Sequence, residues 1–255
     1  MSKKPAIALT SSRLDRNLDR SETVQTQAEI LSARTIDYCN QALDRSRFFN
    51  LLAAGKMTQS LMQYTFLQYH HWRDRLHQWF GLCIVKAGSC TDPHQKTAIL
   101  SLADHTFTDL KDNHSEMFVE FLYDLGLNDS EIAAAKRSPA TSAYERSFFE
   151  EFGYDTHNFY EALAALSGRE LCVSVRNARL LEKYFDSRNL KHPTWLSLHA
   201  ELEVDHYHDS IRPVLMRYED AAKLTSVVQA VEQGIDRHVQ YFDDLLDEYE
   251  ALNRR

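Results

Sequence analysis

The segment "LHAELEVDHYH", residues 198–208, concentrates three histidines and three carboxylates within eleven positions. It contains two interleaved sets with the spacing i, i+4, i+7: a first set of His199, Glu203 and His206 and a second set of Glu201, Asp205 and His208. Residues at this spacing share one face of a helix, because each residue turns the helix by about 100°. Either set could therefore present imidazole and carboxylate groups to one metal ion.

The surrounding apolar residues indicate which set faces inward. With His199 at zero on a helical wheel, the apolar residues of 194–216 centre near about +20°, and the first set lies within about 40° of zero. The second set occupies the polar side. Burying two imidazoles and a carboxylate is unfavourable unless they are satisfied, and a divalent metal satisfies all three. We predict that the first set binds a metal, with a metal-free hydrogen-bonded core cluster as the alternative.

Two further polar residues are expected in the core. His114 is centred on the apolar stripe of a helix expected over residues 101–126, and Glu170 on that of a helix expected over 158–185. Cys172 and Arg176 fall on the polar side of the latter helix. A mid-core glutamate without a partner is rare, because an unpaired buried carboxylate is strongly destabilising. We therefore add His114 and Glu170 to the first set, which gives five metal-binding groups on three helices.

These five groups comprise three imidazoles and two carboxylates, without a thiolate. Such a set suits iron or manganese better than structural zinc, which is bound by four ligands in a closed tetrahedron. Five or more ligands indicate one octahedral ion or two ions bridged by carboxylate, as in helical di-iron proteins that activate dioxygen. HExxH, GxSxG and glycine-rich phosphate loops are absent from the sequence, and Glu203-x-x-His206 is not repeated as a ferritin-like site requires.

The elements that must position these residues are predicted to be helices. Only seven glycines and five prolines occur in 255 residues, and long segments repeat their apolar residues every 3.6 positions. We predict an all-α bundle of seven to eight helices, with a flexible arm over residues 1–20 and a single helical domain over 21–255. Asn128 is expected to cap the helix that follows it.

Composition excludes several classes of partner. The net charge of −8 argues against nucleic acid, since phosphate binding requires a concentrated basic surface. No segment is apolar enough for a membrane span, and the four cysteines form neither a zinc pattern nor a disulfide framework. We expect a cytoplasmic protein with a small-molecule substrate, and a homodimer as a possible assembly.

The residues singled out above resemble those of the haem-oxygenase-like di-metal oxidases. The pattern His199-x3-Glu203-x2-His206 is similar to that family's His-x3-Asp-x2-His, with glutamate in place of aspartate. His114, followed by "MFVEFLYDLG", and Glu170 match the histidine and glutamate of two earlier helices, so that the resemblance spans roughly residues 55–215.

This resemblance implies a haem-oxygenase-like fold, two Fe(II) ions and dioxygen as co-substrate. The implied reactions are N-oxygenation, oxidative C–C cleavage or desaturation of an amino acid, amine or fatty acid. One departure concerns Phe107, which stands where the family usually has a glutamate seven residues before the histidine. Asp104, at about +80° from His114 on the wheel, is the candidate to replace it, whereas Asp109 and Asp112 are expected to face solvent.

Three residues are considered for the substrate side of the site. Arg73 lies in the apolar stripe of a helix expected over residues 61–80 and is predicted to bind a substrate carboxylate, with a structural salt bridge as an equal alternative. His77, on the same expected helix, is a further candidate to face the site. Gly168 either makes room for dioxygen or substrate, or eases close helix packing.

Two other interpretations of the function remain open from the sequence alone. A metal-free helical partner or scaffold protein could keep the fold, and the same fold carries haem oxygenase and thiaminase-like enzymes. Haem oxygenase requires a haem-ligating histidine near the N-terminus and a glycine-rich helix. A thiaminase-like enzyme requires a core-facing cysteine, which the wheel position of Cys172 does not favour.

Overall fold

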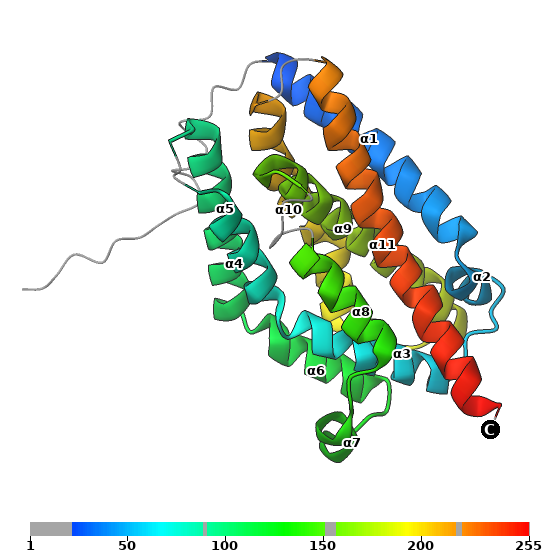
Figure 1. The fold of residues 1–255 in the computed structure, drawn as a ribbon. Coiled ribbons are helices and arrows are strands. Elements are labelled where there is room, and N and C mark those ends of the chain that lie inside the picture. The colour runs from blue at the N-terminus through cyan, green and yellow to red at the C-terminus, as the bar shows by residue number, and fades with distance from the viewer. Residues whose placement is uncertain (1–21, 89–90, 151–156, 218–220, 255) are drawn as a thin grey trace, which may run out of the picture.

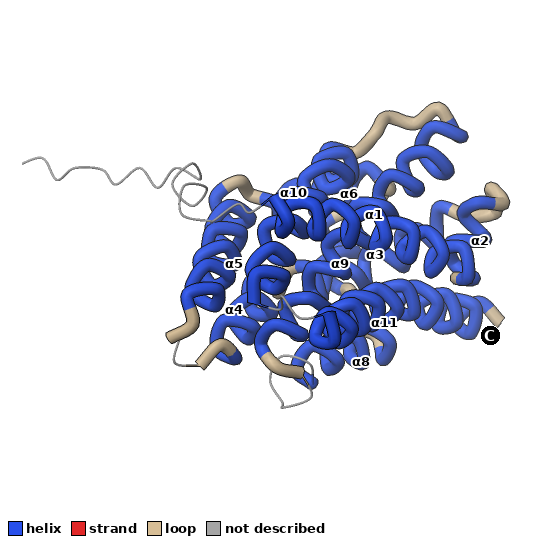
Figure 2. The backbone as a smooth tube through the Cα atoms, turned by 90° about the horizontal axis from the view of Figure 1, so that it is seen from above, coloured by secondary structure: helices blue, strands red, loops and turns tan. Residues whose placement is uncertain are grey.

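A computed structural model describes residues 22–88, 91–150, 157–217 and 221–254, and the arm expected over 1–20 lies outside these ranges. Within them the chain forms eleven α-helices and no strand (Figures 1 and 2). The helices are α1 (Glu22–Arg45), α2 (Arg47–Ala53), α3 (Gln59–Arg73), α4 (Leu76–Lys86), α5 (Pro93–Lys111), α6 (His114–Asp124), α7 (Asp129–Ala134), α8 (Pro139–Phe148), α9 (Phe159–Leu180), α10 (Thr194–Arg217) and α11 (Ala221–Asn253). The π-helical segment Leu181–Phe185 and the 3-10 turn Asp186–Arg188 follow α9. The all-α prediction is confirmed.

Local sequence signals account for several helix starts. Asn128 and Asn158 begin α7 and α9 with capping boxes, in which the asparagine side chain accepts from backbone N–H groups while a glutamate three residues later accepts from the cap's own N–H. The expected cap at Asn128 is therefore confirmed. Asp92 caps α5 and is followed by Pro93, whose missing N–H costs nothing in a first helical turn.

Helix α9 is the central element of the bundle (Figure 1). Of its 22 residues, 18 are buried, and it packs most extensively against α10 and α11. Two glycines permit a close crossing with α11: a Cβ at Gly168 would lie 2.5 Å from the Val231 carbonyl oxygen, and one at Gly234 would lie 2.2 Å from that of Ala165. Of the two roles considered for Gly168, the structure shows close packing.

Two helices expected to be continuous are broken. The helix expected over 61–80 ends at Arg73 and restarts at Leu76, and the helix expected over 101–126 is interrupted at Asn113, which has a left-handed backbone with φ of 56°. Asparagine tolerates this conformation better than most residues because its side chain bonds locally. Each break resets the direction in which the following side chains point. These breaks and the short α2 and α7 also explain why more than eight helices are found.

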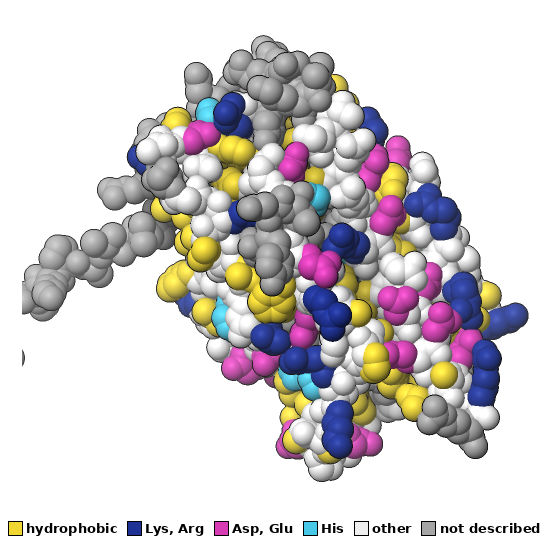
Figure 3. Space-filling model, viewed as in Figure 1, with side chains coloured by type: hydrophobic (Ala, Val, Ile, Leu, Met, Phe, Trp, Pro, Cys, Tyr) yellow, Lys and Arg dark blue, Asp and Glu magenta, His cyan; other side chains and the backbone are white. Residues whose placement is uncertain are grey.

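One hydrophobic cluster extends through the bundle, with members from α1 to α11. No described helix is both long and apolar enough to cross a membrane. On the face seen in Figure 3, positive and negative side chains are interspersed, and hydrophobic side chains gather at the edge where α4 and α5 lie. Val85, Leu100, Phe107 and Leu110 are among the exposed large hydrophobic residues of these two helices.

Candidate metal centre

Two clusters of metal-binding side chains occur among the described residues, and α5 and α10 contribute to both. The first cluster contains His105, Glu203 and His206, and the second contains Asp109, His114 and His199. In each cluster, the candidate ligand atoms lie within 4.8 Å of one another. His105 and Asp109 are one turn apart on α5, as are His199 and Glu203 on α10. Each of these two adjacent helices therefore provides at least one ligand to each cluster.

The first cluster is tightly packed around its imidazoles. The ring centroids of His105 and His206 are 3.5 Å apart, and His206 Nδ1 lies 3.0 Å from Glu203 Oε2. Glu170, from the central helix α9, adds a carboxylate whose Oε1 lies 3.4 Å from His105 Nδ1. Four side chains from three helices thus converge at the first cluster.

Hydrogen bonds and ion pairs with neighbouring residues orient the side chains of the second cluster. His199 Nδ1 donates to the Trp195 carbonyl at 2.9 Å, which leaves the lone pair on its Nε2. Asp109 Oδ1 lies 2.9 Å from His114 Nδ1 and accepts from Arg73 Nη2 at 2.9 Å, while Arg73 Nη1 donates to Ser115. Outer partners of this kind fix the orientation of metal-binding side chains.

Several buried polar atoms of the site have no hydrogen-bond partner. Both carboxylate oxygens of Glu170 are in this state, and so is His114 Nδ1, which approaches Asp109 without hydrogen-bond geometry. Leaving such groups unsatisfied costs roughly 1–3 kcal/mol each, and more for a charged group. A divalent cation would satisfy them at once, so the donor set fits a metal better than it fits a metal-free core.

The ionisable side chains at the first cluster differ strongly in their pKa values. Burial lowers the pKa of His105 to about 3, with His206 adding to the effect. Burial also opposes the charged forms of Glu203 and His206, but their mutual contact prevails and moves the pKa of Glu203 down to about 2 and that of His206 up to about 9. Burial and the neighbouring Glu203 raise the pKa of Glu170 to about 8. Without metal, Glu170 and His206 are therefore protonated at neutral pH.

In the second cluster, burial lowers the pKa of His199 to about 4. Burial alone would raise the pKa of Asp109, but His114 and Arg73 outweigh it and lower that pKa. His199 is therefore neutral and Asp109 ionised at neutral pH, as metal ligands must be.

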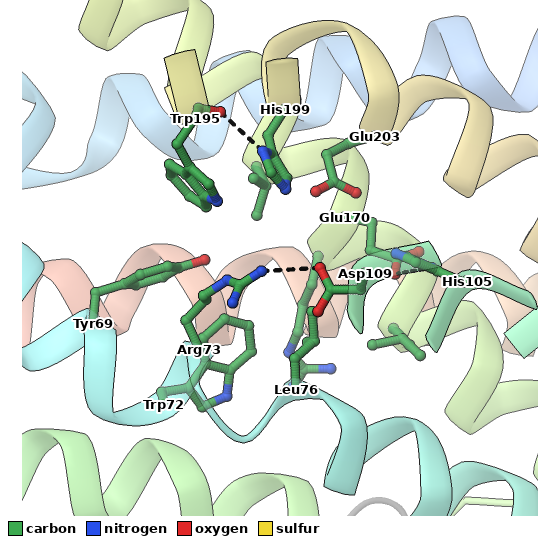
Figure 4. Close-up of a pocket in the computed structure, with 13 residues that line it drawn as sticks. Tyr69, Trp72, Arg73, Leu76, His105, Asp109, Glu170, Trp195, His199 and Glu203 are labelled. Carbon is green, nitrogen blue, oxygen red and sulfur yellow. Dashed lines mark hydrogen bonds and ion pairs between the residues drawn. The ribbon is translucent and has the colours of Figure 1, made fainter. Parts of the chain in front are cut away.

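A cavity of about 30 Å³ lies between the two clusters and the aromatic residues Tyr69, Trp72 and Trp195 (Figure 4). It is lined by members of both clusters together with Glu170, and Leu76, Leu166 and Val173 add apolar surface. A space of this size accommodates one or two water molecules or a dioxygen molecule.

The residues predicted from the sequence are largely brought together. His114, Glu170, His199, Glu203 and His206 all lie in or against the two clusters. Arg73 lines the cavity, but its guanidinium is paired with Asp109, so the salt-bridge alternative describes it.

Asp104 and His77 do not reach the site. Asp104 is exposed and lies outside both clusters, since it points away from the face of α5 that carries His105 and Asp109. His77 is exposed because the break after Arg73 redirects α4. Phe107, at the position of the expected glutamate, is 62% exposed, so this position does not face the clusters.

The sequence interpretation missed His105 and wrongly placed Asp109 in solvent. Both errors come from treating residues 101–126 as one helix, because the break at Asn113 changes the phase between α5 and α6. The sequence of α5 itself contained a signal. Ala98, Leu102, His105 and Asp109 have the spacing i, i+4, i+7, i+11, which places His105 and Asp109 on the same buried face as the two apolar residues.

Comparisons with known proteins identify the family of this chain and its fold. The sequence profile of a family described as iron-containing redox enzymes matches residues 63–243. The chain belongs to this family. No curated protein matches it significantly.

Solved structures show the haem-oxygenase-like fold. A Shewanella denitrificans domain of unknown function with a haem oxygenase-like fold is 16% identical, with 90% of this chain and 94% of that chain covered and a TM-score of 0.70. A CADD-like protein of unknown function from Nostoc punctiforme is 15% identical, with 88% and 98% covered and a TM-score of 0.68. A TenA homologue from Pseudomonas syringae is 14% identical, with 84% and 92% covered and a TM-score of 0.63. The expected fold is thereby confirmed.

Cys172, placed on the polar side by the sequence, is in fact fully buried, because α9 is enclosed on all sides. It interacts with Cys39 of α1. Neither residue lines the cavity between the clusters, and none of the described residues that line it is a cysteine.

Proposed function

We propose that this protein is an oxygen-dependent non-haem iron oxidase or oxygenase that acts on a small molecule, with two Fe(II) ions and dioxygen as co-substrate. One observation carries the proposal: members of two clusters of metal-binding side chains line one cavity together with a glutamate whose oxygens have no hydrogen-bond partner. The iron-containing redox family supports iron as the metal.

The first ion would be held by His105, Glu203 and His206, and the second by Asp109, His114 and His199, with Glu170 offering two oxygens to the same cavity. Histidine and carboxylate ligands on a helical bundle suit Fe(II), and two such ions can supply electrons for the reduction of dioxygen. Asp109 and His105 would take the place of the ligand that the sequence analysis sought at Asp104.

The remaining residues orient the ligands and restrict water. The Trp195 carbonyl selects the His199 tautomer with a free Nε2, and Arg73 holds Asp109 ionised and in place. Tyr69, Trp72 and Trp195 close the cavity with buried rings, which strengthens every electrostatic interaction inside it. Glu170 and His206 must lose their protons to become ligands, so metal binding would be coupled to the release of protons.

The proposal is tested by anaerobic Fe(II) titration of the purified protein, followed by Mössbauer spectroscopy and by oxygen consumption. We expect two irons per chain. His199→Ala and His206→Ala should abolish binding at their clusters, whereas His208→Ala, a matched change on the outer face of α10, should leave binding intact. Less than half an equivalent of iron in the wild-type protein would contradict the proposal and favour a metal-free scaffold.

A further inference from the structure

The outer face of α5 carries a row of exposed apolar side chains. Leu100 is 55% exposed, Phe107 62% and Leu110 59%, and Ala103 is exposed among them. The four residues have the spacing i, i+3, i+7, i+10, so their directions fall within about 80° of one another on the helix. We call this row the α5 seam. Figure 3 shows the hydrophobic side chains gathered at this edge of the molecule.

The α5 seam points away from the metal centre. His105 and Asp109 lie on the inner face of the same helix, and their mean direction is about 160° from that of the seam. An alternating spacing of three and four apolar residues is the pattern by which one helix packs against another. Helices α4, α6 and α10 pack against α5, yet the seam stays exposed. The pattern therefore indicates that a further segment covers it.

The start of α1 lies at the end of the bundle where α5 begins. Figure 1 shows α1 and α11 starting at the same end, and Arg34 pairs with Glu232 about three turns along each helix. Helix α11 begins three residues after α10 ends, and Arg217 at that end lies 3.2 Å from Asp92, the cap of α5. The 21 residues that precede α1 therefore join the bundle near the start of α5.

These preceding residues are long enough to reach the seam. Helix α10 packs against both α1 and α5, so the crossing covers two interhelical distances, or up to about 20 Å. Residues 15–21 span about 23 Å when extended, which lets the part before them run along α5 in the opposite direction. In that part, Ile7 and Leu14 are seven residues apart, as are Leu100 and Phe107. One face of a short helix would present both to the seam.

The charges of the two segments are complementary in this direction. Residues 1–21 contain five basic and two acidic side chains, whereas the whole chain has a net charge of −8. When the segment runs antiparallel to α5, Lys3 and Lys4 come to lie beyond the last residue of the seam. The exposed charged side chains that follow the seam are two acidic residues, Asp112 and Glu116, and one lysine. Opposite charges therefore favour this direction.

From these observations we infer that residues 5–14 of this chain dock on the α5 seam, with Ile7 and Leu14 inward, and cover the metal-binding helix from outside. Removing the apolar side chains of both segments from water favours the docking. Of the arm expected to be flexible, this part would then be held on the bundle. Because the inner face of α5 carries His105 and Asp109, the docked segment would restrict the movement of both side chains. The inference does not rest on the proposed function, since it concerns the outer face alone.

A photo-crosslinking experiment on the full-length, metal-free protein tests this docking directly. The amino acid p-benzoylphenylalanine replaces Phe107, so that one exposed aromatic side chain takes the place of another. On irradiation we expect an intramolecular cross-link to residues 5–14, identified by mass spectrometry of proteolytic fragments. The same amino acid in place of Tyr123, an exposed aromatic residue of α6, is the matched control and should not reach these residues.

Hydrogen exchange gives an independent measurement. The variant Leu110→Glu places a charge in the seam and should speed the exchange of the amides of residues 5–14 by about tenfold or more, equivalent to about 1.4 kcal/mol of docking free energy. Leu190→Glu is the matched control, because Leu190 is also an exposed leucine but lies outside α5. It should leave the exchange of these amides unchanged.

Each outcome decides the inference. Cross-links between two chains would assign the seam to a second copy and overturn it, and so would the absence of a cross-link from position 107 or equal cross-linking from position 123. Unchanged exchange in Leu110→Glu, measured on a variant that keeps the helical circular dichroism of the wild type, overturns it as well. Should that variant fail to fold, the cross-link alone decides. Neither measurement requires metal, so failure here leaves the proposed function to its own test.

Discussion

The crossing of α9 and α11 permits a quantitative test of how the fold holds the metal centre. In the variant Gly168→Ala, the new Cβ would lie 2.5 Å from the Val231 carbonyl oxygen, whereas ordinary contacts begin at 3.4 Å. The atom that it meets belongs to a helix backbone, so no side chain can rotate to relieve the contact. The two helices must separate by up to about 0.9 Å, the difference between these two distances.

The expected cost follows from two opposing terms. Overpacking in a close-packed core destabilises by about 1–3 kcal/mol, and a backbone contact lies at the upper end of this range. Replacing a helical glycine by alanine recovers about 0.8–1 kcal/mol of helix propensity. We therefore expect a net loss of about 1–2 kcal/mol, or a decrease of roughly 2–8 °C in Tm for a domain of this size. Glu170 lies two residues further along α9, so iron binding should weaken as well.

The assay is thermal unfolding of the metal-free protein followed by circular dichroism, together with Fe(II) titration of each variant. Gly81→Ala is the matched control, because Gly81 also lies within a helix but a Cβ added to it would meet no atom within 4 Å. It should raise stability by roughly 0.5–1 kcal/mol through helix propensity alone. Our reasoning would be refuted if Gly168→Ala melted at or above the wild-type temperature and bound iron with unchanged affinity.

Two further predictions concern the metal ligands directly. Asp109→Asn should lower the iron content from two ions to one, because it removes the carboxylate of the second cluster. The control variant Asp104→Asn should retain both ions. Metal analysis and Mössbauer spectra distinguish these results, and equal loss of iron in both variants would contradict the assignment. Metal binding should release about two protons per chain at pH 7, since Glu170 and His206, with pKa values raised to about 8 and about 9, are protonated before they become ligands. Protons compete with metal for these ligands, so the affinity for Fe(II) should rise with pH through the neutral range and level off above pH 9. An indicator-dye titration that detects no release of protons on metal binding would exclude this protonation scheme.

Residues on one unbroken helix could be placed from the sequence. His199, Glu203 and His206 lie on α10 as the wheel predicted, because a continuous helix fixes the angle between its residues and the apolar stripe fixes the inward direction. Glu170 was found for a different reason: a carboxylate amid apolar neighbours is too unfavourable to occur without a partner. The all-α class followed from the few glycines and prolines and from the 3.6-residue period.

Two kinds of residue could not be placed in this way. His105 and Asp109 required the direction of α5 relative to α6, and the left-handed backbone at Asn113 sets that direction. Arg176 and Cys172 were assigned to a polar face that α9 does not have, because other helices surround it. Arg176 is buried with its Nη1 at 3.1 Å from His238 Nε2 of α11, a partner that lies 62 residues away in the chain.

The sequence by itself thus determined the helical class and the ligands within single helices, since both depend on a local period. The tertiary structure alone decided how separate helices are turned toward one another. It thereby placed Asp109 rather than Asp104 beside His114, and it made Trp195 a wall of the cavity. The physical reason is that a break of one or two residues redirects a whole helix, while the packing that selects the new direction comes from distant parts of the chain.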